Sequence, residues 1–264
     1  MQQAEEDRQS QMPRSMDMGA VCPQCGKVDG QRIDWRFIGD ALRQDVFSLE
    51  HGIVHTLVWL LLRPGRVIGD YLAGRRAGYA KPLWLLVSTA ALVVLFNRLL
   101  PGTGTMADFN AGAQAAIGAQ PAAPDNAERA VALLRGLGTW AAANLSIVTL
   151  LLVPLEAAAL KLAFWRAARL NYPEWLTVTA FLTAQTFLLW SIGIALRGVF
   201  PHAELWATRL AVGWFLYSLI RSFDGLKWWN ALLRGAVGLA LYVAGASAAV
   251  GLVVAVVFLV VSTG

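Results

Sequence analysis

Hydrophobic positions dominate the last two thirds of the chain, where long apolar runs alternate with short polar connections. Each run approaches the roughly 20 residues that a helix needs to cross a bilayer. The pattern therefore predicts an all-α, polytopic membrane bundle of about five transmembrane helices. The predicted spans are Pro82 to Leu100, Thr139 to Leu160, Glu174 to Leu196, Leu205 to Phe223 and Ala231 to Ser262.

The part of the chain before Pro82 has no apolar run long enough to span. It has instead an apolar stripe at three- and four-residue spacing, which is typical of an amphipathic helix on the inner membrane surface or on the bundle. The stripe consists of Ile38, Leu42, Val46, Leu49, Ile53, Leu57 and Leu61. We predict a disordered N-terminus (1–20), a degenerate zinc-knuckle segment (21–37), a cytosolic or interfacial amphipathic helix with a basic elbow (38–81) and the bundle (82–264), whose external loop (101–138) is flexible.

The elbow is the sequence RPGRVIGDYLAGRRAGYAKP, between the stripe and the first predicted span. Pro64 and Gly65 favour the end of a helix, Gly74 suits a C-terminal cap, and Pro82 suits a first helical turn. Cations here would meet anionic headgroups at about 1 kcal/mol each. Ordinary topogenic charge explains the arginines equally well, but not the Gly and Pro positions. The predicted headgroup residues are Arg63, Arg66, Arg75, Arg76, Tyr79 and Lys81.

Composition supports membrane residence, because 57% of the residues are hydrophobic and only 15% are charged. The positive-inside rule orients the spans, since more cations flank one set of helix ends than the other. It predicts a cytoplasmic N-terminus and an external C-terminus in a cell's inner membrane. The net charge is +5, but the cations gather at membrane boundaries, so nucleic acid is not an expected partner.

Polar residues within the predicted spans are functional candidates, because each is costly in hydrocarbon. Glu156 is the sharpest, either as a proton or cation site or, the interpretation that the sequence favours, as a partner of Lys161 or a nearby arginine. Thr179, Thr183 and Thr186 share one face of the third predicted span, a pattern more typical of helix packing. Seven tryptophans, Trp175 among them, fall at predicted span ends and suggest interfacial anchors.

Cys22 and Cys25 are the two cysteines, in the sequence CPQCG. A Cys-x-x-Cys turn is half of a zinc site, which a second copy of the chain, or His51 and His55, would complete. An unoccupied knuckle and a redox pair are the alternatives.

The elbow also resembles a bacterial membrane-protein family, domain of unknown function 3667. The resemblance rests on the Pro-Gly, the Tyr-Leu-x-Gly-Arg-Arg, the Tyr and the Pro at this spacing, with support from CPQCG and NYPEW. It implies bacterial inner-membrane residence and supplies no activity. The family often has two cysteine pairs and a His after the Glu of the second motif, where this chain has one pair and Trp175.

Three classes of function are consistent with these features. The preferred one is a membrane scaffold or interaction protein whose elbow contacts lipid headgroups or a partner, with a homo-oligomer as one form. The second is a small transporter or channel that uses Glu156. The third is a lipid-acting enzyme with Asp45, Glu50, His51 and His55; the lack of a Ser-His-Asp, HExxH, P-loop or GxGxxG arrangement weighs against an enzyme.

Overall fold

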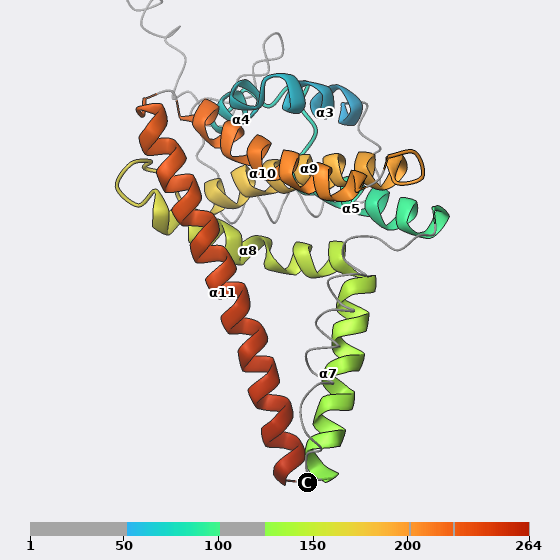
Figure 1. The fold of residues 1–264 in the computed structure, drawn as a ribbon. Coiled ribbons are helices and arrows are strands. Elements are labelled where there is room, and N and C mark those ends of the chain that lie inside the picture. Colours follow the sequence, from blue (N-terminus) through green and yellow to red (C-terminus); the bar gives the residue numbers. More distant parts are fainter. Residues whose placement is uncertain (1–51, 101–124, 201, 224, 264) are drawn as a thin grey trace, which may run out of the picture.

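The structure is a computed structural model that describes residues 52–100, 125–200, 202–223 and 225–263. These residues form helices and no strand, which confirms the predicted all-α class (Figure 1). The predicted segments 1–20 and 21–37, and the stripe as far as residue 51, lie outside the described residues. The helices are α3 (Ile53–Leu62), α4 (Pro64–Leu72), α5 (Pro82–Leu99), α7 (Asp125–Ala143), α8 (Leu145–Ala163), α9 (Tyr172–Leu196), α10 (Ala203–Ser222) and α11 (Trp228–Thr263).

Helix α9 is the centre of the bundle and packs against α5, α8 and α10. It is apolar on all sides, as a helix surrounded by neighbours should be, and Trp175, Phe181 and Phe187 are fully buried. At its start, Asn171 and Glu174 form a capping box, in which the Asn171 backbone N–H donates to Glu174 Oε2 at 2.6 Å.

Helices α5 and α9 pack side by side and run parallel. Their C-terminal ends meet where Arg197 Nη2 donates to Asn97 Oδ1 at 3.1 Å. At the other end of α9, the rings of Phe164, Trp175 and Phe223 pack together. The segments that follow α4, α8 and α10 therefore lie at the same end of the bundle. These segments contain most of the cations that the sequence assigned to one side.

Four helices are long and apolar enough to cross a membrane by length and composition. They are Pro82–Leu99, Ser146–Ala163, Tyr172–Leu196 and Trp228–Val261. The fourth predicted span forms helix α10, but α10 is not among these four, so the structure does not confirm five spans. The physical reason lies in its composition, because Glu204, Arg209 and Arg221 interrupt its apolar surface.

Helices α7 and α11 extend away from the rest of the bundle and converge near the C-terminus (Figure 1). Residues 125–138 belong to α7, so this part of the predicted external loop is helical. A break at Asn144 separates α7 from α8, and the second span candidate begins at Ser146 instead of Thr139.

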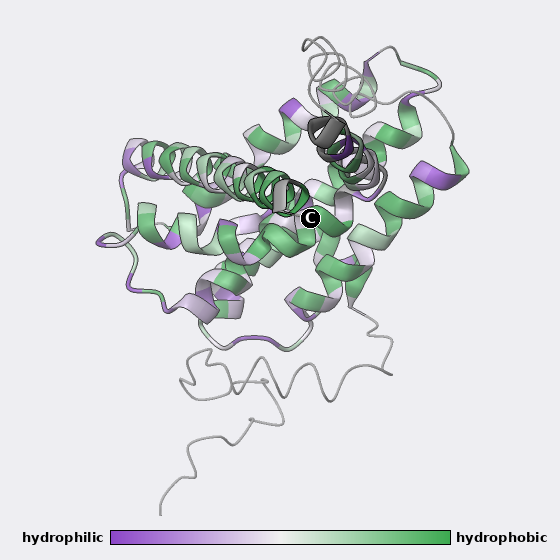
Figure 2. Ribbon diagram, turned by 90° about the horizontal axis from the view of Figure 1, so that it is seen from below, coloured by the Kyte–Doolittle hydropathy of each residue, from purple (hydrophilic) through white to green (hydrophobic). Residues whose placement is uncertain are grey.

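Seen from below, α11 is hydrophobic toward its C-terminal end (Figure 2). Gly238 and Gly245 let α11 approach Leu160 and Leu155 of α8 closely.

Helices α3 and α4 form a layer over α9 and α10 (Figure 1). The last part of the predicted stripe is α3, and the elbow adds a second helix, α4. Gly74 follows α4 with a φ of 82°, a left-handed conformation that suits its predicted role as a cap.

Candidate functional site

The chain bends at Arg63 and Pro64, where α3 ends and α4 begins. This bend, the hinge, positions the basic residues of the elbow. Proline has no backbone N–H, so Pro64 cannot continue the hydrogen bonds of α3 toward the carbonyl of Leu60. Gln185 of α9 supplies the missing donor, with its Nε2 at 3.1 Å from the Leu60 oxygen. The Oε1 of the same amide accepts from Ser218 Oγ of α10, also at 3.1 Å. One buried glutamine therefore ties the hinge to both α9 and α10.

The segment after α4 is pinned to α3 by Thr56. The hydroxyl of Thr56 accepts a hydrogen bond from the backbone N–H of Ala80 at 2.8 Å and donates to the Gly52 carbonyl at 2.8 Å. Both Thr56 and Ala80 are fully buried. This contact fixes the path of the chain into α5.

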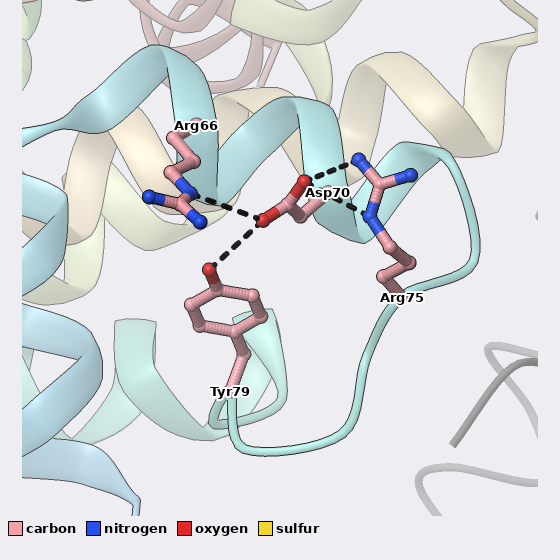
Figure 3. Close-up of polar contacts among 4 residues, drawn as sticks. All are labelled: Arg66, Asp70, Arg75 and Tyr79. Carbon is pink, nitrogen blue, oxygen red and sulfur yellow. Dashed lines mark hydrogen bonds and ion pairs between the residues drawn. The ribbon is translucent and has the colours of Figure 1, made fainter. Parts of the chain in front are cut away.

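Asp70 organises the polar face of the elbow (Figure 3). Its Oδ1 accepts from both Nε and Nη2 of Arg75, and its Oδ2 accepts from the Tyr79 hydroxyl at 3.1 Å. Arg66, one turn earlier on α4, lies with its Nε 3.8 Å from Oδ2. Both Arg75 donors thus share one oxygen, which leaves the other carboxylate oxygen to Tyr79 and Arg66.

A cleft of about 750 Å³ lies between the elbow and the C-terminal end of α10. Its lining has four arginines and one carboxylate, so its formal charge is strongly positive. A site of this size is within the range that binds small ligands. The lining residues are Leu62, Arg63, Pro64, Gly65, Arg66, Gly69, Asp70, Arg75, Tyr217 and Arg221.

The other three predicted headgroup residues, Arg76, Tyr79 and Lys81, do not line the cleft. Arg76 lies over the Tyr71 ring, 5.4 Å from its centroid, and burial lowers the pKa of its guanidinium. Burial also lowers the pKa of the Lys81 ammonium at the start of α5. The pKa of the Tyr79 phenol is raised, first by burial and then by the hydrogen bond to Asp70 and the charge of that carboxylate.

The structure thus brings together three of the six predicted elbow residues at the cleft: Arg63, Arg66 and Arg75. Sequence reasoning did not assign Tyr217 or Arg221 to this site, because they are on α10, far along the chain. It did not assign a role to Asp70 either. The signal for Asp70 was within the motif, since a single acid among five cations is the expected centre of an ion-pair cluster.

The structure does not describe the predicted metal ligands as one site. Cys22, Cys25 and His51 lie outside them, and His55 is exposed, with its ring 6.0 Å from that of Trp59. Within the described ranges, no group of three or more His, Cys, Asp or Glu residues is close enough to hold a metal ion. Asp45 and Glu50, named for the enzyme alternative, also lie outside these ranges.

The intramembrane candidates are brought together in part. Glu156 of α8 is buried, and its Oε2 lies 3.1 Å from Thr183 Oγ1 of α9. The favoured pairing with Lys161 is not among the ion pairs of the described residues; the Lys161 ammonium lies over the Tyr172 ring instead, 5.9 Å from its centroid. Thr179 is buried on the same face as Thr183, whereas Thr186 donates to the Leu182 carbonyl of its own helix at 3.1 Å.

The hinge and the elbow wall of the cleft fall within a segment that matches a known family. Residues 50–94 match the model of the family described as Protein of unknown function (DUF3667). This match confirms the resemblance seen in the elbow. The DUF3667 segment contains α3, α4 and most of α5, and therefore every elbow residue, but not the α10 wall of the cleft. No curated protein and no solved structure matches the chain.

Proposed function

We propose that this protein is a membrane protein that binds the phosphate of an anionic lipid headgroup in the cleft between the DUF3667 segment and α10. The observation that carries the proposal is the set of four arginines around one cleft, from two separate parts of the chain: Arg63, Arg66 and Arg75 on one wall and Arg221 on the other. Arginine presents a planar fork of donors that matches phosphate oxygens.

The position of the cleft favours a lipid over a soluble anion. It adjoins the segment that leads into α5, which is a candidate membrane span, and it lies at the end of the bundle where the cations gather. A headgroup in the cleft would leave its acyl chains beside the apolar helices. The exposed arginine side chains then act at the headgroup level, where cations and anionic lipids attract each other.

The charge of the cleft favours a phosphomonoester. Asp70 pairs with Arg75 and Arg66 and neutralises part of their positive charge, and a strongly positive lining remains. A phosphomonoester has a charge of about −1.5 to −2 near neutral pH, whereas the phosphodiester of most lipids has one negative charge. We therefore expect phosphatidic acid to bind better than phosphatidylglycerol, and phosphatidylcholine to bind least.

Native mass spectrometry of the full-length protein, released from nanodiscs that contain these lipids, tests the proposal. Wild type should retain phosphatidic acid, and the double variant Arg66→Gln/Arg221→Gln should lose most of it. Arg209→Gln is the matched control, because Arg209 is an exposed arginine of α10 that stacks on Trp206 away from the cleft.

Two results would contradict the proposal. Equal retention of phosphatidic acid by wild type and the double variant would exclude the cleft as the binding site. A thermal shift with inorganic phosphate, lost in the double variant while phosphatidic acid gives none, would identify a soluble phosphate as the ligand instead of a lipid.

A further inference from the structure

The buried carboxyl of Glu156 lies apart from the cleft and is not explained by lipid binding. Glu156 is 7% exposed, on a helix apolar enough to span a membrane, and it faces Thr183 of the central helix α9. Thr183 is 3% exposed. An ionised carboxylate at such a place is costly unless a cation or several donors compensate it.

The hydrogen bonds around Thr183 indicate which protonation state of Glu156 the site fits. The hydroxyl Oγ1 lies 2.9 Å from the Thr179 carbonyl oxygen and 3.1 Å from Glu156 Oε2. A hydroxyl has a single proton to donate and two lone pairs with which to accept. If Glu156 were ionised, both of these neighbours would be acceptors, and Thr183 would satisfy only one.

Both contacts become hydrogen bonds when the carboxyl is protonated. Glu156 then donates from Oε2 to Thr183 Oγ1, and Thr183 donates to the Thr179 carbonyl. The result is a continuous chain of donors and acceptors from α8 into α9 without a buried charge. The hydroxyl of Thr179, one turn away on α9, is buried without a hydrogen-bond partner in the part of the chain that the structure describes, so it does not donate to Glu156.

Cations near Glu156 are engaged elsewhere. Lys161 lies over the Tyr172 ring, and Arg234 Nη1 of α11 donates to the Ala163 carbonyl at 2.8 Å. Tyr242 of α11, a neutral phenol, is within electrostatic reach of Glu156. No ion pair found among the described residues includes Glu156. The other charged residues on helices packed against α8 are Glu174 in the α9 cap, Arg98 of α5, and Asp125, Glu128, Arg129 and Arg135 of α7.

We infer that Glu156 is a proton-binding site within the bundle. When its carboxyl holds a proton, it donates that proton to Thr183, and loss of the proton to water leaves a carboxylate between α8 and α9. That carboxylate repels the Thr179 carbonyl dipole through Thr183 and weakens the contact between the two helices. Protonation of this one group therefore sets how tightly α8 packs on the centre of the bundle.

Infrared spectroscopy of the full-length protein in lipid tests the inference, because the C=O stretch of a protonated carboxyl is separate from the amide and carboxylate bands. Wild type at neutral pH should show this band, and it should decrease as the pH rises. Glu156→Gln should remove it. Glu204→Gln is the matched control and should retain it, because Glu204 lies 3.3 Å from Arg197 in an ion pair.

Thr183→Val is a second way to assign the infrared band to Glu156. It leaves every carboxyl in place, and it is useful even if Glu156→Gln fails to fold. Loss of the hydroxyl that accepts from Glu156 should shift the frequency of the protonated band. The inference is overturned if neutral wild type has no protonated-carboxyl band, or if the band is unchanged in both Glu156→Gln and Thr183→Val.

Discussion

Gly65 on α4 lies directly against the backbone carbonyl of Arg221 at the end of α10. A Cβ built on Gly65 would collide with the Arg221 carbonyl and its Cβ. The glycine thus permits the approach of two walls of the cleft that come from distant parts of the chain. This contact also brings Arg221 to the same cleft as Arg66 and Arg75.

Gly65→Ala should therefore destabilise the protein, because the added methyl group forces the backbone of α4 away from α10. An overpacked contact of this kind costs about 1–3 kcal/mol. Thermal unfolding in detergent, followed by circular dichroism, measures the effect as a lower apparent melting temperature. Gly69→Ala on the same helix is the control, since no atom lies within 4 Å of its added Cβ, and alanine favours a helix by up to about 1 kcal/mol. Equal melting temperatures for the two variants would contradict the close approach.

Gln185→Met should destabilise the hinge. The substitution keeps the side-chain volume but leaves the Leu60 carbonyl without the donor that compensates for Pro64, at a cost of about 1–3 kcal/mol. Ser218→Ala should cost less, because the single hydroxyl proton of Ser218 is shared between Gln185 Oε1 at 3.1 Å and the closer Trp214 carbonyl oxygen at 2.7 Å. The double variant should lose less stability than the sum of the single ones, since both remove the same hydrogen bond. Additive losses would show that the hydrogen bond between Gln185 and Ser218 contributes nothing to stability.

Tyr79 should titrate above the ordinary phenol pKa of 10.0, because burial and Asp70 raise its pKa. A group whose pKa is raised by folding stabilises the native state below its unfolded pKa and loses that contribution as the pH rises through the folded value. Carbon NMR of ring-labelled tyrosine, with the signal assigned by Tyr79→Phe, measures the titration. Asp70→Asn should move the Tyr79 pKa back toward 10.0, with the part due to burial retained. A Tyr79 signal that titrates at the same pH in wild type and Asp70→Asn would exclude the carboxylate as a cause.

Trp175→Ala should be among the most destabilising single changes. Trp175 is fully buried between Phe164 and Phe223, and removal of a buried aromatic side chain costs about 3–5 kcal/mol. Trp165→Ala is the control, because Trp165 is 67% exposed and close in sequence. We expect a large fall in the apparent melting temperature for Trp175→Ala and a small one for Trp165→Ala. Similar falls in melting temperature for the two variants would contradict a core role for Trp175 and favour the interfacial role that its sequence position suggested.

The sequence by itself determined the class of the protein and the local boundaries of its helices. Apolar runs of spanning length, the Asn171 cap with Glu174, and the Pro and Gly positions of the elbow act within one or two turns of helix, so they can be read without knowledge of any partner. The family resemblance rests on the same local spacing. The limits were also local: the charges on α10 weaken its apolar character, and Asn144 interrupts the second predicted span.

Only the tertiary structure decided which of these elements meet. Trp175 lies at a helix end, as an interfacial anchor would, yet aromatic rings from the segments that follow α8 and α10 cover it. Arg221 lies at a cleft with Arg66 because Gly65 lets α4 touch α10, and Glu156 faces Thr183 because α8 packs on α9. Such contacts depend on how helices cross and on which small side chains allow close approach. Periodicity within a single helix shows which face is apolar, but not which residue of another helix will lie against it.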